Sequence, residues 1–166
     1  LGQREIWPEF ALPQPDGALR FAMEMPGALY RSEENRTAGD AWAQLPCLSS
    51  IEAQKNYDKL VASSDEFLKS LGYQREDGVY RILRANEERV AVFCHAGFSL
   101  TWLPHLLAIP VHLFWAAFDI THSGVTLLRF DNDPSGLTVP KCLMLSDMSH
   151  IYKENLPYDY NGRLPV

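Results

Sequence analysis

A run of five apolar residues, Val90–Cys94, is followed directly by His95-Ala96-Gly97 and then by an apolar helical pattern. So short a run, with charged residues before it and a glycine soon after it, predicts a strand that is buried on both faces. In α/β folds ligands bind where such a strand ends and a helix begins, because the free N–H groups of the helix can hold an anion. An imidazole there can hold phosphate, transfer a proton or be phosphorylated. We therefore expect a functional role for His95, with a structural hydrogen bond as the competing interpretation.

Two common nucleophile motifs can be tested against the same stretch. A cysteine phosphatase loop needs an arginine six residues after the cysteine, and Leu100 stands six residues after Cys94. A serine hydrolase elbow has the form G-x-S-x-G, and residues 97–101 lack the second glycine. Neither motif fits, and an unrelated hydrolase that uses Cys94 in another arrangement stays as an alternative.

The order of three segments resembles the C-terminal half of the histidine phosphatase superfamily, which includes the phosphoglycerate mutases. They are FCHAG (residues 93–97), SLTWLPHLLAIPVHLFW (99–115) and THSGVTLLRF (121–130). The ending SDMSHI (146–151) also resembles the ending of one bacterial branch. The resemblance covers roughly residues 50 to 155. It implies an α/β fold, a three-layer sandwich with a mostly parallel central sheet, an inserted hairpin and a loop-rich cap region.

The family signature, an Arg-His-Gly triplet near the N-terminus that carries the nucleophilic histidine, is not in this sequence. No Arg-His pair occurs anywhere in the 166 residues. The resemblance therefore implies that residues 1–166 are the C-terminal part of a single domain whose first strand and nucleophile lie upstream. A degenerate, non-catalytic member of the family, which binds phosphate or serves as an interaction domain, is the alternative.

What the resemblance implies for chemistry is a phosphomonoester phosphatase, or a mutase-like phosphoryl transferase, that works through a phosphohistidine. His95 would be the second active-site histidine, the N–H of Ala96 would add a donor to the phosphate, and His122 would lie nearby. Glu5 or Glu9 would give the leaving oxygen its proton. No metal or organic cofactor is expected, and the substrate would be a small phosphorylated molecule.

The composition of the chain limits which binding partners and which cellular compartment are expected. The net charge of −6 argues against nucleic-acid binding by a broad basic surface. The three cysteines show no close spacing, so we expect reduced thiols in a cytoplasmic protein. No apolar run reaches the length of about 18 residues that spans a membrane, and no signal peptide is recognisable. His105 and His112 are separated by Pro110 and lack a third ligand at usable spacing, so no metal site is predicted.

Breaker residues divide the chain into a loop-rich cap region, 1–50, and an α/β core, 51–155. The cap region contains five prolines and four glycines, so only short helical pieces are expected there, over 17–25 and 37–44. Apolar residues at helical spacing predict a helix over 50–71, which Gly72 ends.

The rest of the core is predicted from turn and strand patterns. Asp77-Gly78 between two alternating runs predicts a hairpin over 73–83. A buried helix is expected after His95, with Pro104 in its first two turns, where a missing N–H costs least. Residues 125–130 and 138–145 are expected to form an antiparallel pair of strands.

One consequence of a missing strand concerns the surface. If an upstream strand lies beside Val90–Cys94, its absence leaves apolar side chains and unpaired backbone groups open to water. We therefore expect this segment to be covered either by the missing N-terminal segment or by a second copy of the chain in a homodimer.

Overall fold

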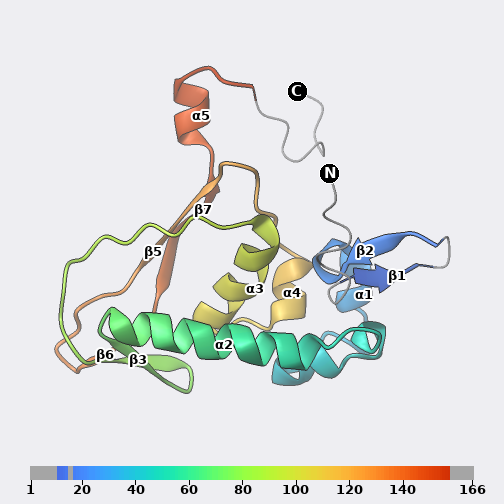
Figure 1. Ribbon diagram of the computed structural model, residues 1–166, viewed down its shortest axis with the longest axis horizontal. Helices are drawn as coiled ribbons and strands as arrows, with labels where there is room; N and C mark the ends of the chain where they lie inside the picture. The colour runs from blue at the N-terminus through green and yellow to red at the C-terminus, as the bar shows by residue number, and fades with distance from the viewer. Residues whose placement is uncertain (1–10, 15–16, 158–166) are drawn as a thin grey trace.

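The computed structural model describes residues 11–14 and 17–157, and Figure 1 shows their arrangement. The longest element is helix α2 (Ala53–Ser70), and helices α3 (Ala96–Leu106) and α4 (Val111–Trp115) lie on one side of it. The N-terminal part of the chain packs near one end of α2 and the β3–β4 hairpin lies near the other. None of the helices within the described ranges is both long and apolar enough to cross a membrane.

Short elements make up the N-terminal region, as the density of proline and glycine predicts. Of the helical piece expected over 17–25, only residues 22–24 are helical, as a 3-10 helix. Residues 19–21 form a strand of a two-stranded antiparallel ribbon, and Gly17 before them has a φ of +78°. The elements are β1 (Ala11–Pro13), β2 (Leu19–Phe21), the 3-10 helix η3 (Ala22–Glu24), α1 (Gly27–Tyr30), and the 3-10 helices η4 (Gly39–Gln44) and η5 (Pro46–Leu48).

Helix α2 and the hairpin after it follow the local sequence closely. Gly72 has a φ of +97°, a conformation that L side chains rarely adopt, and it ends the helix as predicted. The hairpin pairs β3 (Tyr73–Glu76) with β4 (Val79–Ile82), and Asp77 takes a φ of +55° in the turn. The hairpin predicted from Asp77-Gly78 is confirmed.

Helix α3 starts where the sequence predicts, but Pro104 is its ninth residue and not part of its first two turns. A proline at this position cannot donate a hydrogen bond to the carbonyl of Leu100, four residues earlier. The indole N–H of Trp115 on α4 donates to that carbonyl at 3.1 Å. The proline is therefore tolerated because a tertiary hydrogen bond replaces the helical one.

The prediction of a three-layer sandwich with a mostly parallel central sheet is wrong. All strand pairs between described residues are antiparallel, and they form three small sheets. β1 pairs with β2, and β6 (Leu137–Thr138) joins β4 beside β3. The third sheet pairs β5 (Val125–Arg129) with β7 (Lys141–Asp147), with register shifts along it, and a short helix α5 (Ser149–Lys153) follows.

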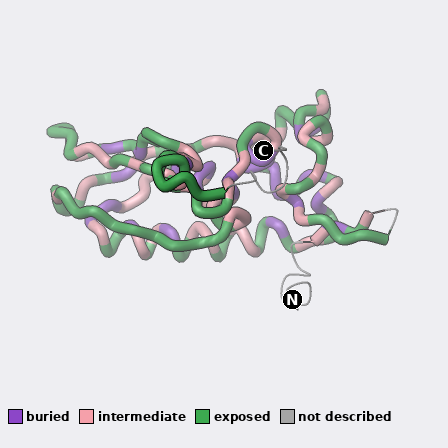
Figure 2. Tube along the Cα trace, turned by 90° about the horizontal axis from the view of Figure 1, so that it is seen from above, coloured by how far each residue is buried: buried purple, intermediate pink, exposed green. Residues whose placement is uncertain are grey.

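The apolar run Val90–Cys94, predicted to be a buried strand, is neither a strand nor buried. None of the backbone hydrogen bonds between described residues involves it. Val90 is 50% exposed, Val92 46% and Phe93 96%. Figure 1 shows this part of the chain as a coil that leads into α3, and Figure 2 shows long exposed stretches along the outside of the trace. A strand needs a hydrogen-bonded neighbour, and no described segment supplies one.

Two apolar clusters hold the elements together. The larger one joins the N-terminal region to α3 and α4, with Tyr30, Trp42 and Phe114 among its buried members. The smaller one joins α2, the hairpin and the end of α3 through Leu68, Tyr80 and other side chains. Helix α3 contributes to both clusters, so its position depends on both halves of the structure.

Candidate functional site

His95 lies at the N-terminal end of α3, directly before the first helical residue. Its backbone is extended, with φ −103° and ψ 157°, and its carbonyl accepts the N–H of Ser99 at 3.0 Å. The side chain makes no capping hydrogen bond, and the residue is exposed. The imidazole therefore stands open to solvent at the end of the helix where partial positive charge collects and where the first N–H groups lack helical partners.

The surroundings of His95 are small and mostly apolar. Ala96 packs against the larger apolar cluster. At Gly97 a side chain would begin 3.5 Å from the methyl group of Met23, so η3 lies against the first turn of α3. The thiol of Cys94 and the hydroxyl of Ser99 are 3.2 Å apart, which links the segment before the helix to its first turn.

His122 lies in a loop that is fixed to β7. The N–H of Thr121 donates to Ser146 Oγ at 2.8 Å, and a Cβ atom on Gly124 would stand only 2.6 Å from the same oxygen. Ser123 takes a left-handed φ of +60° within this turn. His122 itself is exposed. The loop of His122 is thus joined to β7 through Ser146, whereas His95 is placed by α3.

The acid and the cations expected around a phosphate are the parts of the site that the described residues do not assemble. Glu5 and Glu9, the two candidate proton donors, lie outside the described residues. None of the ion pairs within 11–14 and 17–157 involves His95. These ion pairs occur on α2, around the hairpin and along residues 129–141. Within the part of the chain that the structure describes, His95 is therefore an open side chain without an ion-pair partner.

His105 and His112, whose side chains are buried, are separated by the fold. His105 faces α2 from the last turn of α3, and His112 is completely buried on α4, with its ring against the edge of Tyr30 at 6.3 Å between centroids. Burial lowers the pKa of both imidazoles. The described part of the chain brings no three His, Cys, Asp or Glu side chains together in a way that could hold a metal ion.

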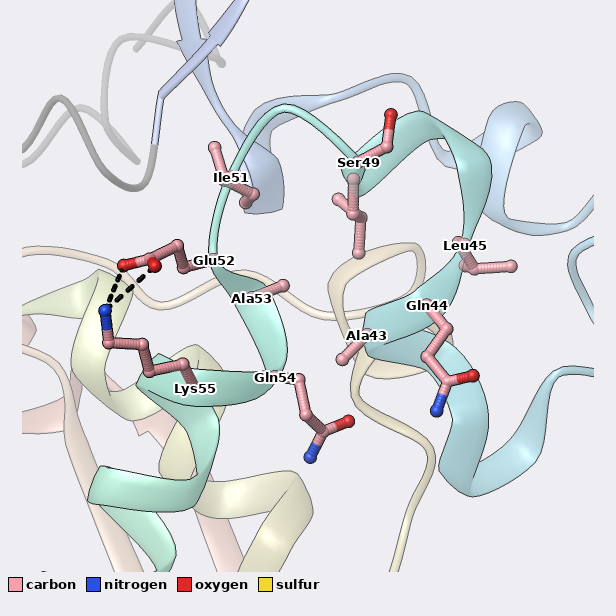
Figure 3. Close-up of a pocket in the computed structure, with 10 residues that line it drawn as sticks. Ala43, Gln44, Leu45, Ser49, Ile51, Glu52, Ala53, Gln54 and Lys55 are labelled. Atoms are coloured by element: carbon pink, nitrogen blue, oxygen red, sulfur yellow. Dashed lines mark hydrogen bonds and ion pairs between the residues drawn. The ribbon is translucent and has the colours of Figure 1, made fainter.

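A hollow of about 270 Å³ lies at the start of α2, away from the predicted site (Figure 3). Its lining comes from η4, η5 and the first turn of α2, and includes neither His95 nor His122. The ion pair of Lys55 with Glu52, at 2.7 Å, borders it, and this pairing lowers the pKa of the Glu52 carboxyl. Both side chains are well exposed, so the hollow is an open surface feature with ordinary charged residues on its rim.

Comparison with models of known protein families, with curated proteins and with solved structures gives no match. The resemblance to the histidine phosphatases therefore rests on the motif residues quoted above.

The sequence did not reveal a polar cluster between α2, the hairpin and α3. It contains Tyr57, Asp65, Arg75 and His105, which are connected by hydrogen bonds and close ionic contacts. The positions of Asp65 and Tyr57 eight residues apart on the same helix hint at a shared face, but only the tertiary structure brings Arg75 and His105 to it.

Proposed function

We propose that this chain is part of a phosphomonoester phosphatase, or a related phosphoryl transferase, in which His95 binds an oxygen of the phosphoryl group. The observation that carries the proposal is the solvent-open imidazole of His95 at the first turn of α3. A protonated imidazole and the adjacent N–H of Ala96 are donors that suit a phosphate oxygen, and charge stabilisation is the main catalytic requirement of phosphoryl transfer.

The reaction would proceed in two displacements. A histidine from a segment outside these 166 residues attacks phosphorus, and the ester oxygen leaves with a proton from Glu5 or Glu9. Water then attacks the phosphohistidine, the P–N bond breaks, and phosphate is released while the same carboxylate takes the proton of the water. His95 holds an equatorial oxygen through both steps.

The exposed segment Val90–Cys94 supports the proposal that the nucleophilic histidine lies on another strand, which would pair with this segment. Its backbone donors and acceptors have no partners among the described residues, and Phe93 is almost wholly exposed. An extended polypeptide could add to this segment by strand pairing, and its side chains would then cover the apolar residues. We propose that the covering strand is the upstream segment; a second copy of the chain in a homodimer is the competing partner.

A cytoplasmic location is part of the proposal. Cys47, Cys94 and Cys142 are all free thiols, and the latter two are exposed. Exposed free thiols are typical of proteins from a reducing compartment.

A non-catalytic phosphate-binding or interaction domain is the second candidate. It is favoured by the small, mostly apolar surroundings of His95, where no described carboxylate or cation makes an ion pair with the ring. In that case the exposed apolar segment would bind a partner protein and no turnover would occur.

The decisive test measures p-nitrophenyl phosphate hydrolysis by this chain together with the sequence encoded upstream of Leu1. We expect turnover, and we expect His95→Ala to reduce kcat by about 100-fold or more, as loss of a charge-stabilising donor does. His150→Ala, which removes an exposed histidine on α5, is the matched control and should keep full activity.

The same preparations separate the two candidates. Phosphate or vanadate binding that is lost in His95→Ala, without any turnover in the unsubstituted protein, would support the phosphate-binding domain. Equal turnover in the His95→Ala and unsubstituted proteins would refute the role of His95. Turnover that alkylation of Cys94 abolishes would instead favour a cysteine hydrolase.

A further inference from the structure

A polar cluster joins α2, β3 and the C-terminal end of α3. His105, its member on α3, stands ten residues after His95, which precedes the first residue of the same helix. Arg75 on β3 makes two hydrogen bonds of 2.7 Å to the carboxylate of Asp65 on α2. The hydroxyl of Tyr57, also on α2, lies 3.3 Å from Nδ1 of His105. The four side chains thus connect α3 to α2 and to the hairpin that follows α2.

His105 is the buried member of this cluster. Its side chain is 5% exposed, and its Nε2 atom is buried without a hydrogen-bond partner. The nearest carboxylate oxygen, Asp65 Oδ1, is 4.0 Å away, which is too long for a hydrogen bond. Asp65 is already engaged by Arg75, so it cannot turn fully toward the ring without giving up part of that contact.

Protonation of His105 would place a cation in this setting. The new charge would be largely removed from water and would stand near the guanidinium of Arg75. Where Tyr57 donates its hydroxyl hydrogen to Nδ1 of the neutral ring, protonation of Nδ1 reverses the contact, so that Nδ1–H becomes the donor and the Tyr57 hydroxyl must reorient. The closed arrangement therefore suits the neutral imidazole and not the charged one.

We propose that His105 is a pH-sensitive latch, whose protonation releases the β3–β4 hairpin from α2 and α3. The latch would act on the candidate site because His105 and His95 stand on the same helix. Trp102, three residues before His105, donates its indole N–H to Ser64 on α2 at 2.8 Å. This hydrogen bond and the contact between His105 and Tyr57 together hold α3 against α2. Opening of the hairpin leaves the contacts of Trp102 with Ser64 and Phe67 between these helices at this end.

The surroundings of His105 shift the pKa of its imidazole in opposing directions. Burial is the main cause that lowers its pKa, Arg75 on β3 lowers the pKa further, and Asp65 on α2 raises it by less. From β4, the buried hydroxyl of Tyr80 faces the cluster without a hydrogen-bond partner, and burial raises the pKa of that hydroxyl to about 12.

Tyr57 is the other titratable neighbour of His105. Burial is the main cause that raises the pKa of Tyr57; Arg75 on β3 lowers this pKa, and Asp40 on η4 and Asp58 on α2 raise it by less. Both tyrosines are therefore neutral across the range in which His105 titrates. The net effect of the surroundings is to keep the His105 ring neutral while the latch is closed.

The direction of the pH effect follows from these causes. In the open state the ring is in water and regains an ordinary pKa of about 6.5. Opening then takes up a proton below that pH. The open population rises about tenfold for each pH unit below about 6.5, until the lower pKa of the closed state is reached.

Hydrogen exchange of backbone amides at pH 7.5 and 5.5, corrected for the intrinsic exchange rate, tests the latch. We expect the opening equilibrium of the hairpin amides of residues 73–82 to rise by up to about tenfold at pH 5.5, and the amides of α4 to change less. His105→Gln, which has no titrating ring, should remove the rise, and the control His150→Gln should retain it.

Two results would overturn the proposal. One is a hairpin response in His105→Gln equal to that of the unsubstituted protein. The other is an equal response of hairpin and α4 amides, which would point to global unfolding and to the buried His112. If His105→Gln does not fold, the NMR titration of the His105 ring in the unsubstituted protein decides: a midpoint below 6.5 supports the latch, and a midpoint at or above 6.5 refutes it.

Discussion

At the scale of single residues, buried hydroxyl groups show how unequal similar side chains can be. Tyr30 is completely buried, and its hydroxyl donates to the carbonyl of Ala22 at 2.6 Å. Burial strongly raises the pKa of this hydroxyl. Tyr80 is nearly as deeply buried, but its hydroxyl has no hydrogen-bond partner. The sequence shows two tyrosines, and only the packing decides which hydroxyl contributes to stability.

This difference predicts opposite effects of the same substitution. Tyr30→Phe should lower the free energy of unfolding by about 1 kcal/mol, because it removes a buried hydrogen bond and leaves the carbonyl of Ala22 with only the longer one from the N–H of Met25, at 3.3 Å. Tyr80→Phe should be neutral or stabilising, since it removes an unpaired buried hydroxyl. Urea unfolding of both variants measures the effect, and a larger loss for Tyr80→Phe would contradict it.

At the scale of elements, the predictions from local sequence are confirmed for the end of α2 and for the hairpin turn, and are wrong for the position of Pro104 within α3. Gly72 and Asp77-Gly78 predicted the end of α2 and the hairpin turn, because left-handed backbone conformations and tight turns depend on the residues that adopt them. Pro104 was expected early in α3 and lies in its third turn. The indole of Trp115, which no local rule could place, supplies the hydrogen bond that this proline removes.

Two glycines of the same hairpin region give a test of this scale. Gly72→Ala should destabilise the fold by about 1 to 3 kcal/mol, because its φ is +97° and the new Cβ would stand 2.9 Å from the carbonyl oxygen of Arg84. Gly78→Ala has no atom within 4 Å and no left-handed φ, so it should leave stability unchanged within about 1 kcal/mol. Thermal unfolding of the two variants compares them, and equal losses would count against the expected strain at Gly72.

At the scale of the whole molecule, apolar surface is unevenly covered. Phe114 lies in the larger cluster and is 1% exposed, whereas Phe93 is 96% exposed on the coil before α3. Val125, Leu127 and Leu143 are also well exposed on the β5–β7 sheet. Exposed apolar side chains on unpaired or edge segments favour association with other polypeptides.

The same substitution at the two phenylalanines should therefore act on different properties. Phe114→Ala should cost about 3 to 5 kcal/mol of unfolding free energy through the cavity it leaves. Phe93→Ala should change that free energy by less than about 0.5 kcal/mol and should reduce self-association. Urea unfolding and static light scattering measure the two effects. A large stability loss in Phe93→Ala would show that this side chain is covered in solution.

The candidate site was predicted from the sequence only in part. The sequence located a histidine at the start of a helix, and the structure places His95 at the N-terminus of α3. Glu5 and Glu9 lie outside the described residues, so their role as its partners stays a prediction, and the loop of His122 is held by a contact to β7. The cluster around His105 was missed because its members come from three elements.

What the sequence determined by itself is local: the helix that ends at Gly72, the turn at Asp77-Gly78, and the start of α3 after His95. Only the tertiary structure decided which strands pair, so that β6 joins β4, β5 pairs with β7, and Val90–Cys94 pairs with no described segment. The physical reason is that helix ends and tight turns are stabilised by contacts between near neighbours in sequence. A strand, in contrast, needs a hydrogen-bonding partner that the pattern of its own residues does not specify.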